Sequence, residues 1–212
     1  MISSNNAPST AALLVFGAGG HGRVVADAAL LCSHWSIVTA SDRNPTSCQG
    51  ELLPGVLLMA AASVSTLAGF VHIAIGSSAA REKEAASWGA DRLASVLHPA
   101  ATVSRFSRIE AGCFVAAGAV VGPAAMVGTC VIINHGVVVD HDVEIGAFSH
   151  IAPNAVLGGH VKVGRRVLIG AGAVVLPSMV IGDDVTVGAG AVVSTHLLAA
   201  GTYVGIPARR IQ

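Results

Sequence analysis

The sequence predicts an α/β, Rossmann-like domain over residues 11–97, then a parallel β-helix over residues 98–195 and a C-terminal extension over 196–212. Two observations predict this fold class. A glycine-rich loop directly follows an apolar strand near the N-terminus, and an aliphatic residue returns at every sixth position from Val103 to Val193. The first pattern is typical of a domain that binds phosphate groups, and the second of a solenoid.

Within the first domain, strands are expected at 13–16, 36–40 and 71–75, with helices at 23–31 and from Ser77 through Trp88. The first strand leads into the loop GAGGHG, residues 17–22, and the second ends just before Asp42. This is the G-x-G-x-x-G spacing, with an acidic residue about twenty positions further on, that marks a dinucleotide-binding turn. A last strand is expected at 92–97, and the domain boundary near His98-Pro99.

The glycine-rich loop predicts a diphosphate site, because free backbone N–H groups and the helix dipole favour phosphate oxygens there. About ninety residues are too few for a complete dinucleotide domain with a hydride-acceptor site, so a nucleotide-linked sugar fits better than a nicotinamide cofactor. A purely structural role for the glycines, in a tight strand-to-helix turn, stays open.

In the second half, a period of six fits neither an amphipathic helix nor a single strand. Short strands joined by turns satisfy it: each unit places one aliphatic residue inside, a small residue near the next corner, and glycine where the backbone turns. Three units make an 18-residue triangular coil, and about five coils follow Val103. No long loop interrupts them, so any site lies on the coil surface or between subunits.

The composition narrows the function further. The 212 residues are 53% hydrophobic and carry twelve basic and twelve acidic side chains, so a core can form without disulfides or metal, and no basic stripe for duplex nucleic acid appears. The cysteines have no zinc-ligand spacing, and we expect them to be small buried apolar residues: Cys32, Cys48, Cys113 and Cys130.

The N-terminal segment gives an expectation about location. Residues 1–10 lack a positively charged region, and the apolar stretch at 11–16 is too short for an export signal or a membrane span. We expect a cytoplasmic protein without membrane insertion.

Histidine has the unperturbed pKa closest to working pH, and the β-helix offers His135, His141, His150 and His160 as general bases. His141 is flanked by Asp140 and Asp142, and a neighbouring carboxylate can orient an imidazole and raise its basicity. Residues 18 apart lie above one another, which places Gly159 beside His141 and predicts a gap there for a ligand. His141 is therefore the best candidate base.

The whole layout resembles the bacterial hexapeptide-repeat sugar acetyltransferases of the PglD and NeuD type. The segments that carry the resemblance are residues 17–22, His98-Pro99, 133–150 and the ending Val204-Gly205-Ile206-Pro207-Ala208. It implies a left-handed β-helix, a homotrimer, acetyl-CoA as co-substrate, no metal, and a nucleotide-linked amino sugar held by the first domain. Isoleucine at 206, where the family often has asparagine, affects a fine contact.

The resemblance also assigns roles to residues. It matches His141 to the catalytic base, Asp142 to its acidic partner, where glutamate is frequent, and His150 to a position near the thioester. The expected acetyl-CoA contacts are His150, Gly159, Ala171, Ala189 and Arg209, although the C-terminal arginines can equally be a solvated tail. The expected substrate contacts are Gly17, Gly19, Gly20, His21, Gly22, Asp42, Gly76 and Asn134.

We expect direct attack of the acceptor on the thioester, because no cysteine or serine has an obvious histidine partner for a covalent relay. The favoured acceptor is the amine of a UDP-linked 4-amino-4,6-dideoxy sugar, and a sialic acid hydroxyl is the alternative. A γ-type carbonic anhydrase is disfavoured, because no two β-helix histidines have its H-x₄-H spacing. A non-enzymatic scaffold is also disfavoured, because it would not account for the phosphate-type loop or for the carboxylate-flanked His141.

Overall fold

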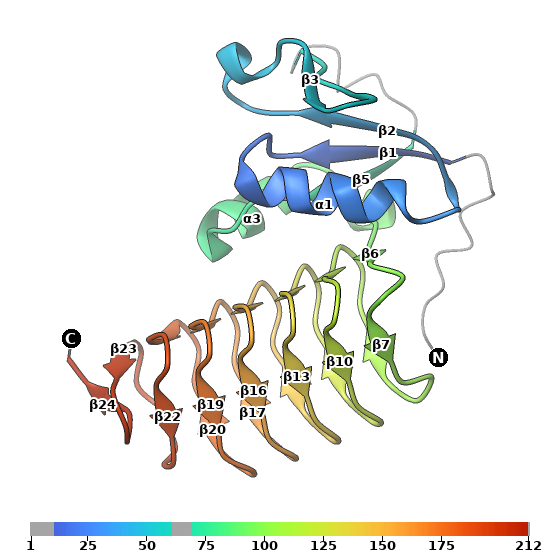
Figure 1. Ribbon diagram of the computed structural model, residues 1–212. Helices are drawn as coiled ribbons and strands as arrows, with labels where there is room; N and C mark the ends of the chain where they lie inside the picture. Colours follow the sequence, from blue (N-terminus) through green and yellow to red (C-terminus); the bar gives the residue numbers. More distant parts are fainter. Residues whose placement is uncertain (1–10, 61–68, 212) are drawn as a thin grey trace.

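The computed structural model describes residues 11–60 and 69–211. A small α/β domain lies over one side of a parallel β-helix, so the predicted fold class is confirmed (Figure 1). Within the described residues, no helix combines the length and the apolar character needed to cross a membrane.

The first domain is built on a parallel three-stranded sheet in the order β2-β1-β5. Its strands are β1 (Ala11–Phe16), β2 (Trp35–Ser41) and β5 (Phe70–Ile73), with helices α1 (Gly20–Leu30) and α3 (Ser78–Ala85). The strands agree with the predicted ones to within two residues. Three features were not predicted: the 3₁₀ turns at Pro45–Ser47 and Ala90–Arg92, and the hairpin of β3 (Glu51–Leu53) and β4 (Val56–Leu57). Because the strands are parallel, the loops after β1, β2 and β5 meet at one sheet edge.

The β-helix consists of two- to four-residue strands in three sheets, parallel except for the antiparallel pair at the C-terminal end of one sheet. Its coil repeats every 18 residues, as in the pairing of Val120 with Val138. The six-stranded sheet contains β7 (Thr102–Val103), β10 (Val120–Val121), β13 (Val138–Val139), β16 (Val156–Leu157), β19 (Val174–Val175) and β22 (Val192–Val193). The five-stranded sheet contains β8 (Arg108–Ile109), β11 (Met126–Val127), β14 (Glu144–Ile145), β17 (Lys162–Val163) and β20 (Val180–Ile181).

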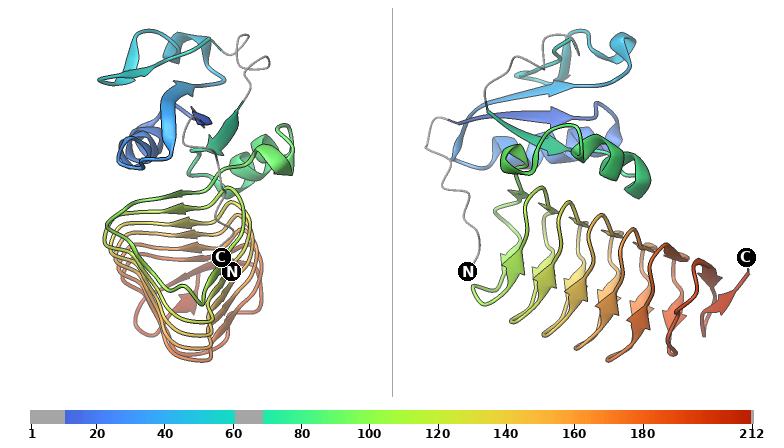
Figure 2. Two further views of the ribbon diagram at one scale, coloured as in Figure 1. Left: turned by 90° about the vertical axis from the view of Figure 1, so that its right-hand side faces the viewer. Right: turned by 180° about the vertical axis from the view of Figure 1, so that it is seen from behind.

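The eight-stranded sheet faces the first domain (Figure 2). It contains β6 (Val96–Leu97), β9 (Phe114–Val115), β12 (Ile132–Ile133), β15 (His150–Ile151), β18 (Leu168–Ile169), β21 (Val185–Val187), β23 (Gly201–Val204) and β24 (Arg209–Arg210). β6 pairs with β9, so the end of the segment predicted as the last strand of the first domain already belongs to the β-helix. Leu93, three residues earlier, still bridges to Val71 of the first domain.

The hexapeptide period places its aliphatic residues inside the coil, where residues such as Val121, Val139 and Leu157 are at most 1% exposed. The small residues four positions later are also buried, including Ala119, Ala155 and Ala173. These two rows form one continuous apolar core, and its burial stabilises each coil against the next.

The prediction that the glycines after the aliphatic residues turn the chain was wrong. These glycines lie before the turn at each corner of the coil. A Cβ atom on Gly122 would lie 2.8 Å from the Asp140 carbonyl carbon, so this glycine permits close packing of adjacent coils. The chain turns two residues later, where φ is positive at every sixth position from 112 to 190. Those positions hold glycine in some coils and Asp142, Asn154 or His160 in others; Asn, Asp and His are the non-glycine residues most frequent in this conformation.

Two sets of contacts fix the first domain to the β-helix. Phe114 and Ile132, which point outward from the eight-stranded sheet, pack into the apolar core beneath α1. The buried Arg81 side chain of α3 donates to the main-chain oxygens of Cys130, Phe148 and Ser149 in the β-helix, and to those of Ile75 and Gly76 in its own domain. The position of the first domain over this one sheet is therefore set by both apolar packing and hydrogen bonds.

Candidate functional site

The glycine-rich loop between β1 and α1 has two glycines that the fold requires and two that are open. Gly17 has φ of +119°, and a Cβ atom on Gly22 would lie 1.9 Å from the Gly17 carbonyl oxygen. Gly19 and Gly20 are exposed, with nothing within 4 Å of an added Cβ atom. The first N–H groups of α1 begin there and lack intrahelical acceptors. This surface suits a phosphate group, because a ligand can approach the backbone closely.

The predicted residues Asp42 and Gly76 lie at the same sheet edge as the loop. Asp42 follows β2, and its Oδ2 accepts a hydrogen bond of 2.8 Å from the N–H of Ala18 in the loop. Gly76 follows β5 and is exposed, one residue before the N-cap Ser77 of α3. The structure thus brings together the substrate residues predicted in the first domain.

His21, the histidine of the loop, lies against the eight-stranded sheet. Its ring centroid is 5.4 Å from that of Phe114 and 6.4 Å from that of His150, and Asn134 Nδ2 lies 3.3 Å from His150 Nε2. Burial, reinforced by neighbouring positive groups, lowers the pKa of His21 to about 3, and burial lowers that of His150 to about 4. Both imidazoles are therefore neutral near pH 7, which allows hydrogen bonding but makes them weak bases.

His141 and Asp142 form the predicted pair at a corner of the β-helix. His141 Nδ1 lies 2.7 Å from Asp142 Oδ2, and both side chains are nearly half exposed. The hydrogen bond from His141 to Asp142 raises the pKa of His141, and the charges of Asp140 and Asp142 add to this effect. The pair thus has the geometry of a general base whose imidazole is oriented by a carboxylate.

Gly159 lies beside His141, as the 18-residue register predicts, but the space left by its missing side chain is occupied. A Cβ atom on Gly159 would lie 2.5 Å from Nε2 of His141. The imidazole of His141 itself fills the predicted gap. Gly159 therefore makes room for the base rather than for a ligand against the backbone.

Within one chain, the phosphate loop and the base lie far apart around the coil. Residues 140–143 form the corner between the six- and five-stranded sheets, opposite the eight-stranded sheet that the first domain covers (Figure 2). His150 lies on the covered sheet, beside the first domain.

The other residues predicted to bind acetyl-CoA are also separated from His141 in one chain. Ala171 and Ala189 are exposed and stack 18 residues apart at the corner between the eight- and six-stranded sheets. Arg209 is exposed on β24, near the C-terminus. A single chain therefore does not bring the predicted site residues together.

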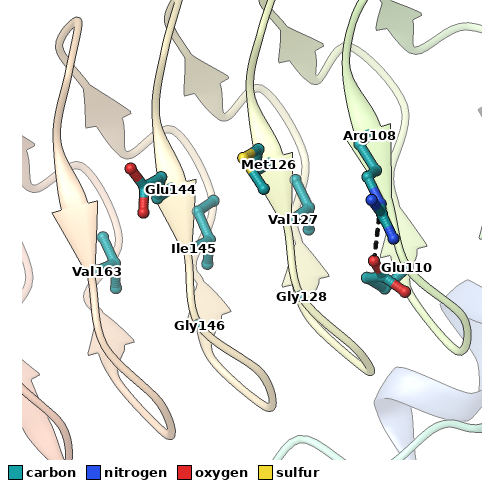
Figure 3. A pocket seen from close by; sticks show the side chains of 9 residues that line it. All are labelled: Arg108, Glu110, Met126, Val127, Gly128, Glu144, Ile145, Gly146 and Val163. Carbon is teal, nitrogen blue, oxygen red and sulfur yellow. Dashed lines mark hydrogen bonds and ion pairs between the residues drawn. The ribbon is translucent and has the colours of Figure 1, made fainter. Parts of the chain in front are cut away.

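Two surface clefts differ in whether they contain predicted site residues. One cleft, of about 330 Å³, runs between the start of α3 and the β-helix and includes Gly76, Ser77, His150 and Arg166. Another depression lies on the five-stranded sheet, where Arg108 pairs with Glu110 beside Met126 and Glu144 (Figure 3). It contains none of the predicted site residues, whereas the first cleft contains two.

The sequence analysis missed Arg81, because its hydrogen bonds link two domains and no sequence pattern marks them. It named His160 as a candidate base but did not place it beside Asp142. The 18-residue coil predicts this position, and His160 Nε2 lies 3.8 Å from Asp142 Oδ2. Among the residues described, ligand atoms of His141, Asp142 and His160 lie within 4.8 Å of one another, close enough to hold a metal ion.

Comparison with known proteins gives a consistent result. The PglD N-terminal domain family matches residues 12–87, and the bacterial transferase hexapeptide family, with six repeats, matches residues 160–195. The comparison with curated proteins gives no match.

Solved structures match over the whole architecture. The acetyltransferase domain of PglB from Neisseria gonorrhoeae FA1090 is 31% identical, covering 95% of this chain and 100% of that chain with a TM-score of 0.89; it has also been solved with acetyl coenzyme A. A point mutant of GDP-perosamine N-acetyltransferase from Caulobacter crescentus, with CoA and GDP-perosamine bound, is 32% identical, covering 95% of this chain and 97% of that chain with a TM-score of 0.86. WeeI from Acinetobacter baumannii AYE is 25% identical, covering 95% and 100% with a TM-score of 0.86.

The identity to the PglB domain extends across both parts of the fold, and the N-terminal family match covers the phosphate loop. The chain therefore belongs to the family of PglD-type, hexapeptide-repeat sugar N-acetyltransferases.

Proposed function

We propose that this chain transfers the acetyl group of acetyl-CoA to the amine of a nucleotide-linked 4-amino-4,6-dideoxy sugar. The observation that carries the proposal is the His141–Asp142 pair, with Nδ1 bound to the carboxylate and the imidazole seated over Gly159. Two relatives support the same pair of substrates: the Caulobacter enzyme has been solved with CoA and GDP-perosamine, and the PglB domain with acetyl coenzyme A. UDP is our first choice of nucleotide, and GDP is the carrier in the Caulobacter relative.

In the proposed reaction, the neutral amine attacks the thioester carbonyl carbon and Nε2 of His141 accepts the amine proton. The carbon–sulfur bond then breaks, and the CoA thiolate leaves and takes up a proton. Asp142 keeps Nδ1 of His141 protonated and stabilises the imidazolium. No covalent acyl-enzyme is needed, so both substrates bind together.

We further propose a homotrimer whose neighbouring subunits complete each site. The phosphate loop and His141 lie on opposite sides of one coil, so a nucleotide sugar bound by one chain can meet only the His141 of another. The six-stranded sheet offers a contact surface, because its outward side chains form an apolar row: Val120, Val138, Val156, Val174 and Val192. Such a row is commonly buried in a closed, symmetric oligomer.

The proposal is tested by measuring CoA release from acetyl-CoA with UDP- and GDP-linked 4-amino sugars, and with free and CMP-linked sialic acids. We expect release only with an amino sugar, and a loss of about 100-fold or more in kcat for His141→Ala. His196→Ala is the matched control, since it removes another exposed β-helix histidine at the same kind of corner, three coils further along. Turnover with sialic acid alone, or His141→Ala within about tenfold of wild type, would contradict it.

A further inference from the structure

The turn that holds Asp142 is repeated one coil later by His160. Positions 124, 142, 160 and 178 occupy the same corner in successive coils, and all four residues have positive φ, between 58° and 64°. The N–H of His160 donates a 3.1 Å hydrogen bond to the carbonyl oxygen of His141, which fixes one corner against the other. The backbone therefore directs the His160 side chain along the same edge of the coil as Asp142.

The side chain of His160 reaches the carboxylate that orients the base. Its Nε2 lies 3.8 Å from Asp142 Oδ2, the same oxygen that bonds to His141 Nδ1 at 2.7 Å. The rings of His141 and His160 meet edge to face, with centroids 5.1 Å apart. One carboxylate oxygen therefore bonds to His141 and lies within ion-pair distance of His160.

The remainder of this corner adds one further charge. Asp140 bonds through Oδ1 to the His141 N–H, and its charge favours the protonated imidazole. The equivalent positions in the coils before and after are Ala124 and Ser178, which do not titrate in the working range. The groups that face Asp142 here are therefore His141 and His160, with Asp140 beside them.

We propose that His160 is a positioning residue that acts on His141 through Asp142. Its ring packs edge to face against His141 and lies within ion-pair distance of Asp142 Oδ2, so it limits the orientations open to both side chains. A fixed positive charge at position 160 would compete for that oxygen and repel the imidazolium, and so would weaken His141 as a base. The effect on turnover rests on the proposed function of His141, but the effect on His141 titration does not.

His160→Lys and His160→Asn separate this role from a purely structural one. Lysine keeps a positive charge at this position at all working pH values, and asparagine removes the charge while tolerating positive φ. The histidine Cε1–H signal of His141 is followed by NMR against pH, in EDTA so that no metal ion is held by the three side chains. Ser178→Lys, one coil further along the same corner, is the matched control.

We expect His160→Lys to move the His141 midpoint to lower pH by about half a unit, the size of a like-charge interaction over a few ångströms of water. Ser178→Lys should move it less, and His160→Asn should not move it downward. In CoA-release assays we expect His160→Asn to lower kcat about three- to tenfold with KM nearly unchanged, a modest part of the contribution of a general base.

Equal midpoints in wild type and His160→Lys would overturn the inference, as would an equal shift in Ser178→Lys. These results do not depend on the reaction. If His141→Ala keeps its activity while the midpoints move as expected, the proposed role of His141 as base fails and the electrostatic coupling stands.

Discussion

Gly159 lies directly against the imidazole of His141. A methyl group at position 159 would lie 2.5 Å from Nε2, so close that the imidazole would have to move. The φ of Gly159 lies outside the left-handed region, so alanine fits its backbone. Gly159→Ala should therefore displace the imidazole from Asp142 without unfolding the coil. We expect a fall of at least about tenfold in kcat, with the melting temperature nearly unchanged.

A double-mutant cycle separates this effect from general damage. If Gly159→Ala acts only by displacing His141, it should cost little further activity in a His141→Ala background. Equal losses in both backgrounds would show that Gly159 contributes through something other than the base.

The pH dependence of kcat/KM should follow the hydrogen bond between His141 and Asp142. A base acts unprotonated, so activity falls as the pH drops through the pKa of His141, which Asp142 raises. Asp142→Asn removes the charge that favours the imidazolium, so the pKa falls and the acid limb of the profile moves to lower pH. Rate profiles from about pH 5 to 9 test this. An acid limb that stays in place would identify another group as the titrating base.

The buried Arg81 side chain should be essential for attachment of the first domain. Arg81→Met leaves main-chain oxygens of Phe148, Ser149 and Cys130 buried without these donors. Each buried, unsatisfied polar group costs about 1–3 kcal/mol, so we expect a loss of about 3 kcal/mol or more. Denaturant unfolding measures it. Lys83→Met, on the exposed side of the same helix, is the control and should lie within about 0.5 kcal/mol of wild type.

The valine row should determine the oligomeric state. Val156→Glu places a charge in the middle of the outward face of the six-stranded sheet, where a neighbouring subunit would desolvate it. We expect monomers in analytical ultracentrifugation, with nucleotide-sugar binding retained and acetyl transfer lost.

Met126→Glu on the five-stranded sheet is a control for the added charge, since Met126 is also outward and exposed and lies in a depression without predicted site residues. A Val156→Glu variant that stays oligomeric, or a monomer that keeps full activity, would contradict a site shared between subunits.

Much of the candidate site could be predicted from sequence, because the constant length of the coil means that residues 18 apart stack on one another. A period of six fixes an 18-residue coil, and this alone places Gly159 beside His141 and His160 above Asp142. The phosphate loop could also be predicted, because GAGGHG forms a single strand-to-helix turn whose residues are consecutive in sequence. The glycine row was misinterpreted because close packing between coils and a left-handed turn both favour glycine, and only the backbone angles distinguish them.

The two folds and the register of the coils can be deduced from residue order, because they depend on patterns at fixed spacing, and the pairing of His141 with Asp142 follows from their adjacency. The sheet that the first domain covers cannot be deduced in this way. That arrangement buries Arg81, brings His21 beside His150, and leaves His141 at the opposite corner. The physical reason is that docking of two domains depends on the shapes and hydrogen-bonding groups of surfaces formed by residues distant in sequence.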